Sequence, residues 1–402
     1  MMVIEHIGEL AGIVPEGVLR RQGAEMDETG ILHNAWIAVE DGKIADFGTG
    51  DAPAGGERID AAGGMVLPAF CDSHTHIVYA GSRDGEFLDK IRGLSYEEIA
   101  ARGGGILNSA DLLHGTSEEE LYRQAMVRVR EMMACGTGAM EIKSGYGLNP
   151  ADEMKMLRVI RRIRESVPAA VKATFLGAHA VGRGYTHEAY VREVIAMTPE
   201  AATLADFIDV FCDEGFFTPE DTARILEAGA AAGLRPKLHA NELAESGGVQ
   251  VGVAHGALSV DHLERAGDAE IAALRGSETM PTMLPGSSFF LGLPYGRAKD
   301  FIAAGLGVAL ASDYNPGSSP AGDMRFVMAL GCIRMRLTPV QALNAVTLNG
   351  AYAMGLSAET GSITRGKRAD LILSTPGWTL TKLPYLYRSP FIRKVFLHGI
   401  PV

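Results

Sequence analysis

Between residues 65 and 313, short hydrophobic runs alternate with longer segments whose hydrophobic positions recur at helical spacing. The short runs carry Val, Ile, Phe or Thr, and most end in a polar residue or a glycine, which is typical of buried strands. Eight runs are predicted strands: 65–76, 139–143, 171–179, 207–213, 236–241, 258–262, 280–284 and 308–313. The longer segments 117–135, 152–166 and 218–232 are predicted helices, and the first opens with a serine N-cap and an acidic turn.

Strands that alternate with helices are joined by crossover connections, so neighbouring strands run parallel. Eight of them predict an α/β fold, a closed (β/α)8 TIM-like barrel. An open, doubly wound sheet is the alternative. No glycine-rich dinucleotide fingerprint follows the first predicted strand, which counts against that alternative.

The two ends of the chain show a different pattern. Up to Pro68, alternating runs such as 36–39 and 43–47 are separated by Asp-Gly and Gly-Gly turns, which is hairpin chemistry. After a helix-like segment at 339–354, the pattern of residues 361–402 again predicts strands, at 370–373 and 394–397. We therefore predict a composite β-sandwich domain formed by residues 1–68 and 360–402, and a barrel domain at 69–359.

Composition narrows the classes of function. The chain is 47% hydrophobic and 21% charged, which is ordinary for a soluble protein with a large core. No apolar run approaches the roughly 18 residues that a membrane span needs, and the first ten residues show no secretory signal. A formal net charge of −12 argues against nucleic acid or an anionic membrane as the main partner. A small anionic substrate remains compatible with this net charge, since one buried arginine can make the electrostatic potential positive around its own site.

The four cysteines are widely separated and form no Cys-x-x-Cys pair, which argues against a disulfide framework or a zinc knuckle. They are Cys71, Cys135, Cys212 and Cys332. Small buried thiols suit a reducing compartment, so we expect a cytoplasmic protein.

Histidines gather at the predicted strand ends, where barrel enzymes place their catalytic groups. Five of the eleven lie there, and the last strand ends in a carboxylate: His74, His76, His179, His239, His262 and Asp313. A lone His-x-His pair is a weak signal, although strand period two would point both rings to the same side. It becomes strong once His239 and Asp313 are added, because three nitrogens and one carboxylate suit Zn²⁺ or Fe²⁺. We predict one divalent metal bound by His74, His76, His239 and Asp313.

Such a metal lowers the pKa of bound water from ~15.7 toward ~7 and polarises a carbonyl group, which is the chemistry of hydrolysis. A general base must then move protons between water and the leaving nitrogen. Asp313, His262 and Glu242 are the candidates, and Glu242 lies three residues beyond His239. Glu242 could instead be a helix N-terminal acid that the dipole favours.

Several motifs resemble the amidohydrolase superfamily, and more specifically its imidazolonepropionases. The general ones are LPAFCDSHTHIVY (67–79), HANE (239–242), VDH (260–262) and Ser312-Asp313. The more specific ones are SHTHIVYAGSR (73–83), GLSYEEIAARGGGI (93–106), EIKSGYGL (141–148), TFLGAHA (174–180), DHL (261–263) and SDYNPGSS (312–319). The resemblance runs from about residue 30 to the end. It departs at 181–185, Val-Gly-Arg-Gly-Tyr, where the family usually has a proline and an acidic residue.

The resemblance implies the ring opening of 4-imidazolone-5-propanoate by water, giving N-formimino-L-glutamate in histidine degradation. It implies the same four metal ligands, and a homodimer. It also implies substrate contacts by Arg83, Tyr96, Tyr146, His179, Glu242, Asn315, Gly317 and Ser318, with His262 close to the metal. Lys143 is read as structural, because the family is mononuclear.

Other interpretations stay open at this point. Arg83 could form a surface ion pair, and Tyr146 and Asn315 lie in ordinary turn sequences. A cytosine- or guanine-deaminase-like aminohydrolase would share the metal ligands. A catalytically silent barrel that serves as a scaffold is the third possibility, although such relatives usually lose a ligand.

Overall fold

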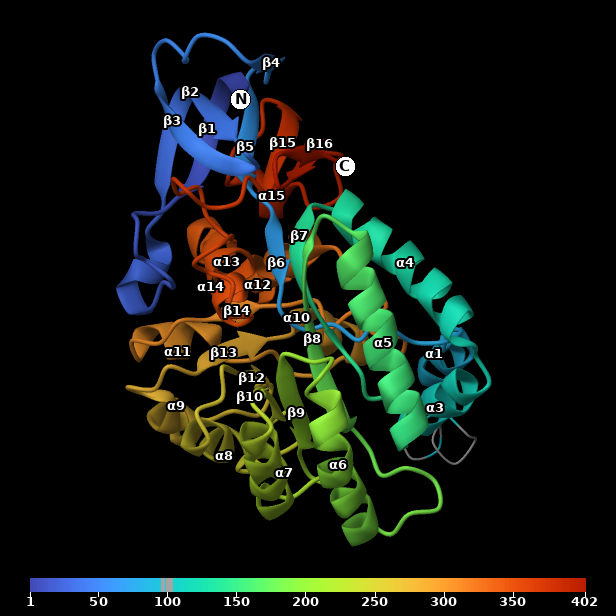
Figure 1. The fold of residues 1–402 in the computed structure, drawn as a ribbon. Coiled ribbons are helices and arrows are strands. Elements are labelled where there is room, and N and C mark those ends of the chain that lie inside the picture. The colour runs from blue at the N-terminus through green and yellow to red at the C-terminus, as the bar shows by residue number, and fades with distance from the viewer. Residues whose placement is uncertain (95–97, 99–103) are drawn as a thin grey trace.

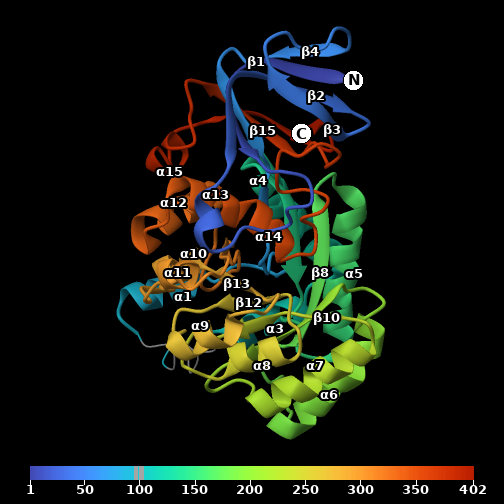
Figure 2. The same cartoon turned by 90° about the vertical axis from the view of Figure 1, so that its left-hand side faces the viewer.

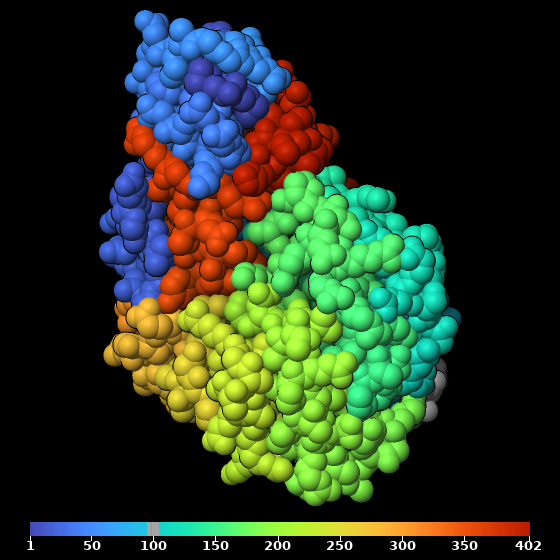
Figure 3. Space-filling view, in the orientation of Figure 1, coloured from blue at the N-terminus to red at the C-terminus, as the bar shows by residue number. Residues whose placement is uncertain are grey.

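The computed structural model describes residues 1–94, 98 and 104–402. Its two ends meet in a β-layer at one end of the molecule, and the barrel with its helices lies beneath (Figure 1). A view from the side shows the same two layers (Figure 2). In the space-filling view the first and last segments of the chain lie against each other on the surface (Figure 3).

The β-layer is a sheet with the strand order β17-β16-β15-β5-β1-β2-β3, in which β4 pairs with β1. Its strands are β1 (Met2–Ile13), β2 (Gly30–Glu40), β3 (Lys43–Thr49), β4 (Glu57–Asp60), β5 (Gly64–Pro68), β15 (Leu371–Pro376), β16 (Ile392–Leu397) and β17 (Ile400–Pro401). The predicted hairpin is confirmed at β2–β3, where Asp41 and Gly42 both have positive φ, as a two-residue primed turn requires. The antiparallel pairing of β15 with β5 joins the two ends of the chain.

The barrel sheet has the order β14-β13-β12-β11-β9-β8-β7-β6, with parallel pairing throughout and a short β10 beside β9. Its strands are β6 (Phe70–Asp72), β7 (Thr137–Lys143), β8 (Ala170–Ala178), β9 (Phe207–Cys212), β10 (Arg235–Pro236), β11 (Leu238–Ala240), β12 (Ser259–His262), β13 (Met280–Met283) and β14 (Ala309–Leu310). Each of the eight predicted runs holds one barrel strand, so the predicted α/β barrel is confirmed.

Helices surround this barrel (Figure 1). They are α1 (Asp84–Ile91), α3 (Ile106–His114), α4 (Glu118–Ala134), α5 (Pro150–Ser166), α6 (His187–Ala201), α7 (Pro219–Ala231), α8 (Gly248–Ala254), α9 (Asp268–Leu274), α10 (Pro285–Leu291), α11 (Ala298–Ala303), α12 (Met324–Met335), α13 (Pro339–Val346), α14 (Leu348–Tyr352) and α15 (Lys382–Tyr385), with a 3₁₀ turn η1 (Gly23–Asp27). Within the described ranges, none of them is both long enough and apolar enough to cross a membrane.

Local sequence explains where the predicted helices begin. Ser117 caps α4 by accepting a hydrogen bond from Glu120 N, and Thr218 caps α7 in a reciprocal capping box. The predicted start of α5 at 152 was too late, because Asn149 is the N-cap and Pro150 occupies the first turn. The predicted helix 339–354 is interrupted at Thr347, whose φ of −128° and ψ of −91° separate α13 from α14.

The predicted first strand, 65–76, was wrong as a single element. Its first part, β5, pairs within the terminal sheet, and its second part, β6, opens the barrel. Between them Ala69 N donates to Asp370 O and Phe70 N to Gly136 O, so the chain passes from one sheet to the other within two residues. His74 and His76 therefore follow β6 instead of lying on it. The division into 1–68 with 360–402 and 69–359 remains our proposal for the domain boundaries.

The seam between the first and last barrel strands is closed by the segments that follow them. His76 N donates to Tyr314 O over 2.9 Å, and Asp313 N donates to His74 O over 3.0 Å. Below them the buried Asp72 carboxylate accepts hydrogen bonds from Ser312 N and Ser312 Oγ. The closure of the barrel thus fixes His74, His76 and Asp313 relative to one another.

Candidate metal centre and substrate site

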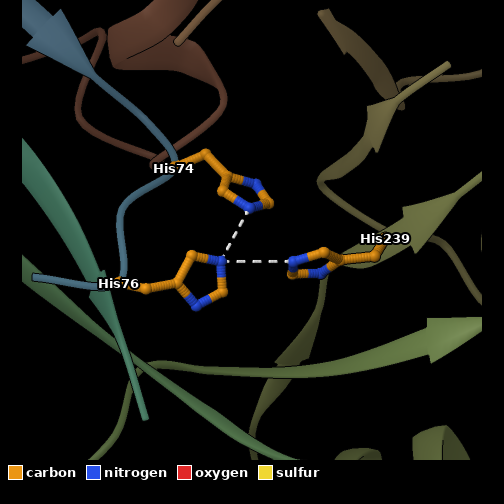
Figure 4. Close-up of side chains that lie close together, drawn as sticks. All are labelled: His74, His76 and His239. Carbon is orange, nitrogen blue, oxygen red and sulfur yellow. Dashed lines mark hydrogen bonds between the residues drawn. The ribbon is translucent and has the colours of Figure 1, made fainter. Parts of the chain in front are cut away.

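Three histidines converge at the carboxyl end of the barrel (Figure 4). His74 and His76 come from the segment after β6, and His239 comes from β11. His76 Nε2 lies 3.2 Å from His74 Nε2 and 3.4 Å from His239 Nε2. All three rings are almost completely buried.

Asp313 brings a carboxylate to the same point. Its Oδ1 lies 3.7 Å from His74 Nε2 and 3.5 Å from His76 Nε2. Ligands about 2 Å from one tetrahedral ion are about 3.3 Å apart, so these separations fit a single divalent ion. Ligand atoms of His74, His262 and Asp313 form a second group close enough to share an ion. His262 therefore lies close to the proposed ion, beside the four predicted ligands.

The ionisation of the site suits a cation. Burial, together with the charge of Lys143 for His74 and the ring of His179 for His76, holds the pKa of both imidazoles well below its usual value. Both rings are therefore neutral and can offer a lone pair. Burial raises the pKa of the Asp313 carboxyl, which marks it as a group that gains from a nearby positive charge.

Backbone strain is concentrated at the same strand ends. Asn241, His262, Leu263 and Asp313 have positive φ, between 54° and 84°, a region that residues other than glycine rarely adopt. They lie at or just after the ends of β11, β12 and β14, beside the converging side chains. Strained backbone of this kind is retained only where the surrounding structure holds it in place, and it is found mostly at functional sites.

Glu242 and His262 form a second buried group beside the metal ligands. His262 Nε2 lies 3.6 Å from Glu242 Oε2, and His262 Nδ1 lies 3.5 Å from Glu264 Oε2. Burial raises the pKa of Glu242 to about 7. Burial opposes protonation of His262, but the charges of Glu242 and Glu264 outweigh it and raise its pKa well above the usual value. The Glu242 main chain is fixed by Asp213, whose carboxylate accepts from the backbone N–H groups of residues 242, 243 and 244.

Aromatic rings line one side of the histidine cluster. His179 stacks on His76 with ring centres 5.2 Å apart, and its Nδ1 lies 3.0 Å from Gly145 O. Tyr146 is buried, with its ring centre 5.4 Å from that of His179. Burial lowers the pKa of His179 to about 3, so it is a neutral hydrogen-bonding group.

Arg83 lies at the start of α1 and faces the loop after β14. Its Nε and Nη2 donate to Glu86 Oε2 over 2.9 and 2.6 Å. Glu86 also accepts from Gly105 N and Asn108 Nδ2, which ties α1 to α3. A Cβ placed on Gly317 would overlap the Arg83 guanidinium, so the glycine allows the close approach. Arg83 thus forms an ion pair with Glu86, but this pair is largely buried, with side-chain exposures of 9% and 11%.

The loop after β14 is organised by Asn315. Its Oδ1 accepts from Gly317 N and Ser318 N, both over 2.8 Å, and its Nδ2 donates to Asp313 O. Ser318 Oγ in turn donates to Asp313 Oδ2 over 3.3 Å. This turn therefore links the Arg83 side of the site to the Asp313 carboxylate.

Tyr96 lies outside the described residues. The atypical segment 181–185 carries Arg183, which forms an exposed ion pair of 2.9 Å with Asp111 on α3.

The structure also brings in side chains that we did not single out from the sequence. Asp261 Oδ2 lies 2.7 Å from His74 Nδ1, and Asp209 Oδ2 lies 2.9 Å from His239 Nδ1. Lys143 Nζ donates to Glu141 and Asp209, so its structural interpretation fits the ion pairs observed. One feature of the sequence could have pointed to these side chains, namely an acid or a lysine inside a predicted buried strand. Asp261 within Ser259–His262 is an example.

Comparison with known proteins places the chain in a family. The amidohydrolase family model matches residues 65–401. An imidazolonepropionase from Flavobacterium johnsoniae is 51% identical over 99% of this chain and 98% of its own length. Another from Christiangramia forsetii is 50% identical over 99% of each chain. A zinc-bound adenosine deaminase from Xanthomonas campestris shares the fold, with a TM-score of 0.73 and 17% identity over 100% of this chain and 92% of its own. By family model, by identity and by coverage, this chain belongs to the imidazolonepropionases of the amidohydrolase family.

Proposed function

We propose that this protein opens the ring of 4-imidazolone-5-propanoate with water, which gives N-formimino-L-glutamate in the degradation of histidine. The observation that carries the proposal is the pairing of two sites at one end of the barrel. One is the convergence of His74, His76, His239 and Asp313, and the other is the Arg83 guanidinium against the Gly317 loop. The name shared by the 50% identical relatives supports the same reaction.

We assign one divalent ion to His74, His76, His239 and Asp313, and propose Zn²⁺ or Fe²⁺ because the donors are imidazole and carboxylate. When bound, such an ion polarises a carbonyl group and lowers the pKa of water. The fit is supported by neutral imidazoles and donor separations of 3.2 to 3.7 Å.

Proton transfer falls to the buried acids and His262. A pKa of about 7 lets Glu242 take up and release a proton near neutral pH, as a general acid–base requires. His262 lies 3.6 Å from Glu242 and 3.5 Å from Glu264, and in its protonated form it stabilises the charged state of Glu242. We therefore propose that Glu242, with His262 and Asp313, removes the proton of water and returns one to the departing ring nitrogen.

Substrate orientation is assigned to a second group of residues, which includes Arg83, His179 and the loop after β14. Arg83 binds the propionate carboxylate, because a guanidinium matches a carboxylate in a bidentate fashion. His179 and Tyr146 contact the planar ring, and Asn315, Gly317 and Ser318 in the loop after β14 contribute further substrate contacts. We assign Tyr96 as a further substrate contact from the sequence resemblance alone.

A direct assay tests the reaction. The metal-loaded protein is given 4-imidazolone-5-propanoate, and loss of the ultraviolet absorbance of the ring is followed, with guanine and cytosine as competing substrates. We expect loss of absorbance, and no release of ammonia from either base. Ammonia release without ring opening would instead establish an aminohydrolase.

The scaffold alternative has its own test. We expect about one metal ion per chain in the purified protein, and none or little in His239→Ala, because a buried nitrogen donor is lost. A metal content near zero in the wild-type protein would favour a silent barrel.

We further propose, from the sequence resemblance alone, that the protein is a homodimer, and we propose that it is cytoplasmic. Free thiols at Cys71, Cys135, Cys212 and Cys332 suit a reducing compartment. Light scattering on the purified protein measures the mass, and a value near 42.7 kDa would mean a monomer.

A further inference from the structure

In two of the three convergent histidines, a carboxylate lies next to Nδ1, the ring nitrogen that does not face the other histidines. Asp261 Oδ2 is 2.7 Å from His74 Nδ1, and Asp209 Oδ2 is 2.9 Å from His239 Nδ1. The second contact has the length but not the linear geometry of a hydrogen bond, and Asp209 Oδ1 also accepts from His239 N over 3.0 Å. His76 differs, because its buried Nδ1 has no hydrogen-bond partner among the described residues.

These carboxylates belong to a buried ionic cluster in the barrel interior. Lys143 Nζ lies 2.9 Å from Asp209 and 2.7 Å from Glu141, and Lys237 Nζ lies 2.8 Å from Glu141. Asp261 Oδ2 is 3.7 Å from Lys237 and 3.9 Å from Lys143. All five side chains are fully buried. Two cations thus face three carboxylates, which lowers the cost of burying the acids beside the histidines.

The hydrogen bond from His74 to Asp261 determines which nitrogen of His74 carries the proton, and the short Asp209 contact favours the same tautomer in His239. A carboxylate at Nδ1 accepts a hydrogen bond only from an Nδ1–H tautomer, and the lone pair is then left on Nε2. In His74 and His239, Nε2 is the atom that faces His76 and the centre of the cluster. Outer carboxylates of this kind fix the orientation of a ligating imidazole and raise its basicity.

We infer that Asp209 and Asp261 are positioning residues of the metal centre, which hold His239 and His74 in the Nδ1–H tautomer with Nε2 directed at the ion. Lys143 and Lys237 are the counterions that keep both carboxylates in place. This inference rests on the proposed metal site and adds two residues that do not touch the ion. The competing explanation is a cluster that only fills the barrel interior.

Metal affinity of the folded protein separates the two explanations. Asp209→Asn and Asp261→Asn keep the side-chain shape, and each removes one negative charge. Glu141→Gln removes the same charge from the same cluster, and within the described part of the chain the Glu141 carboxylate pairs with Lys143, Lys237 and Thr174 instead of a histidine, so it is the matched control. Zn²⁺ dissociation constants are measured by competition with a chromophoric chelator, and folding of each apo-protein is checked by circular dichroism.

We expect Zn²⁺ to bind about 10- to 100-fold more weakly in each aspartate variant. Glu141→Gln should lower the unfolding temperature and weaken binding much less. Equal weakening in all three variants would overturn the inference, because a loss of charge or of packing would then explain the effect. If the wild-type protein itself bound no metal, the proposed function would fall first and the inference with it.

A second measurement uses only the wild-type protein, so its outcome does not depend on whether a variant folds. In protein labelled with ¹⁵N-histidine, imidazole ¹⁵N shifts report the tautomer of each ring in the metal-free state. We expect His74 and His239 as Nδ1–H tautomers before metal is added. An Nε2–H tautomer at either ring would overturn the inference for that ring, while leaving metal binding and ring opening as separate questions.

Discussion

At the scale of single residues, the approach of Arg83 to Gly317 links the two halves of the candidate site. The guanidinium is held on one edge by Glu86 and is covered by a loop position that has no room for a side chain. Lys90 Nζ donates to Gly317 O over 3.0 Å, so the loop is also fixed from α1. The position of the proposed carboxylate-binding group therefore depends on a missing Cβ.

Gly317→Ala should displace Arg83 and raise KM at least about tenfold, with a smaller effect on kcat. The reason is that Arg83 binds the carboxylate equally in the substrate and in the transition state, so its loss weakens binding more than it slows the reaction. Steady-state kinetics with 4-imidazolone-5-propanoate measures both constants. Gly85→Ala is the matched control, since a Cβ at Gly85 on α1 meets no atom of the described residues within 4 Å. An unchanged KM in Gly317→Ala would separate Arg83 from substrate binding.

Asp313 is the second residue on which the site depends, because its carboxylate faces two histidines and also accepts a hydrogen bond from Ser318. Asp313→Asn should lower the metal content or the turnover, or both, by at least about tenfold, since a charged oxygen donor is lost. Elemental analysis and the absorbance assay measure the two effects. Normal metal content together with a normal rate would remove Asp313 from the site.

At the scale of elements, the helices are fixed by their caps. At the start of α7, Thr218 Oγ1 accepts a hydrogen bond from Asp221 N, and Thr218 N donates one to Asp221 Oδ2. The two residues of this capping box thus satisfy each other's backbone N–H groups. Helix α7 packs closely on β9, because a Cβ on Gly229 would overlap Ile208. The cap thus supports a helix that lies behind the strand carrying Asp209.

Thr218→Ala should lower the free energy of unfolding by about 1 kcal/mol, as the loss of an N-cap usually does. Urea unfolding followed by circular dichroism measures it. Thr203→Ala, an exposed threonine just after α6, is the control and should change stability by less than about 0.5 kcal/mol. Equal effects at the two positions would contradict the role of the cap.

A buried lysine before β15 gives a prediction of pH dependence. Lys367 donates to Ser362 Oγ, and burial lowers its pKa to about 8 from a usual value of 10.5. The unfolded chain therefore binds more protons between pH 8 and 10.5, so the free energy of unfolding rises with pH in that window.

Lys367→Met should be more stable than the wild type at pH 7, by on the order of 1 kcal/mol. Its advantage should shrink as the pH rises above about 8, because the lysine of the wild type becomes neutral. Urea unfolding at pH 7, 9 and 10 measures the difference. A difference that stays constant over this range would contradict the buried, shifted lysine.

At the scale of the whole molecule, the proposed ion would join segments that are distant in the chain. His74 and His76 follow β6, His239 ends β11, and Asp313 follows β14 at the seam of the barrel. Bridging these segments in the folded state alone should stabilise the whole barrel.

Removal of metal with a chelator should therefore lower the unfolding temperature. Addition of Zn²⁺ at about 1,000 times its dissociation constant should restore about 4 kcal/mol of stability. Differential scanning calorimetry measures both steps, and His239→Ala is the control that should not respond. An unfolding temperature independent of metal would contradict a site shared between these strands.

Much of the fold follows from local patterns, whereas the support of the site does not. Each barrel strand was visible as a short hydrophobic run, and the Asp41-Gly42 turn and the Ser117 cap follow from their own dihedral preferences. The break between β5 and β6 was not visible, because both halves of 65–76 are equally hydrophobic and only pairing with β15 or β7 distinguishes them. Likewise, Asp261 lies 187 residues from the histidine it contacts.

Residue type and strand-end position can be read from the chain alone, and they predict the four proposed metal ligands. The barrel is predicted in the same way, because alternating periods of two and 3.6 residues leave few other ways to bury the hydrophobic runs. The tertiary structure alone decided that the Nε2 atoms meet, that Asp209 and Asp261 support them, and that Gly317 admits Arg83. These are distances between strands, and they are fixed by the closure of the barrel, which no local preference encodes.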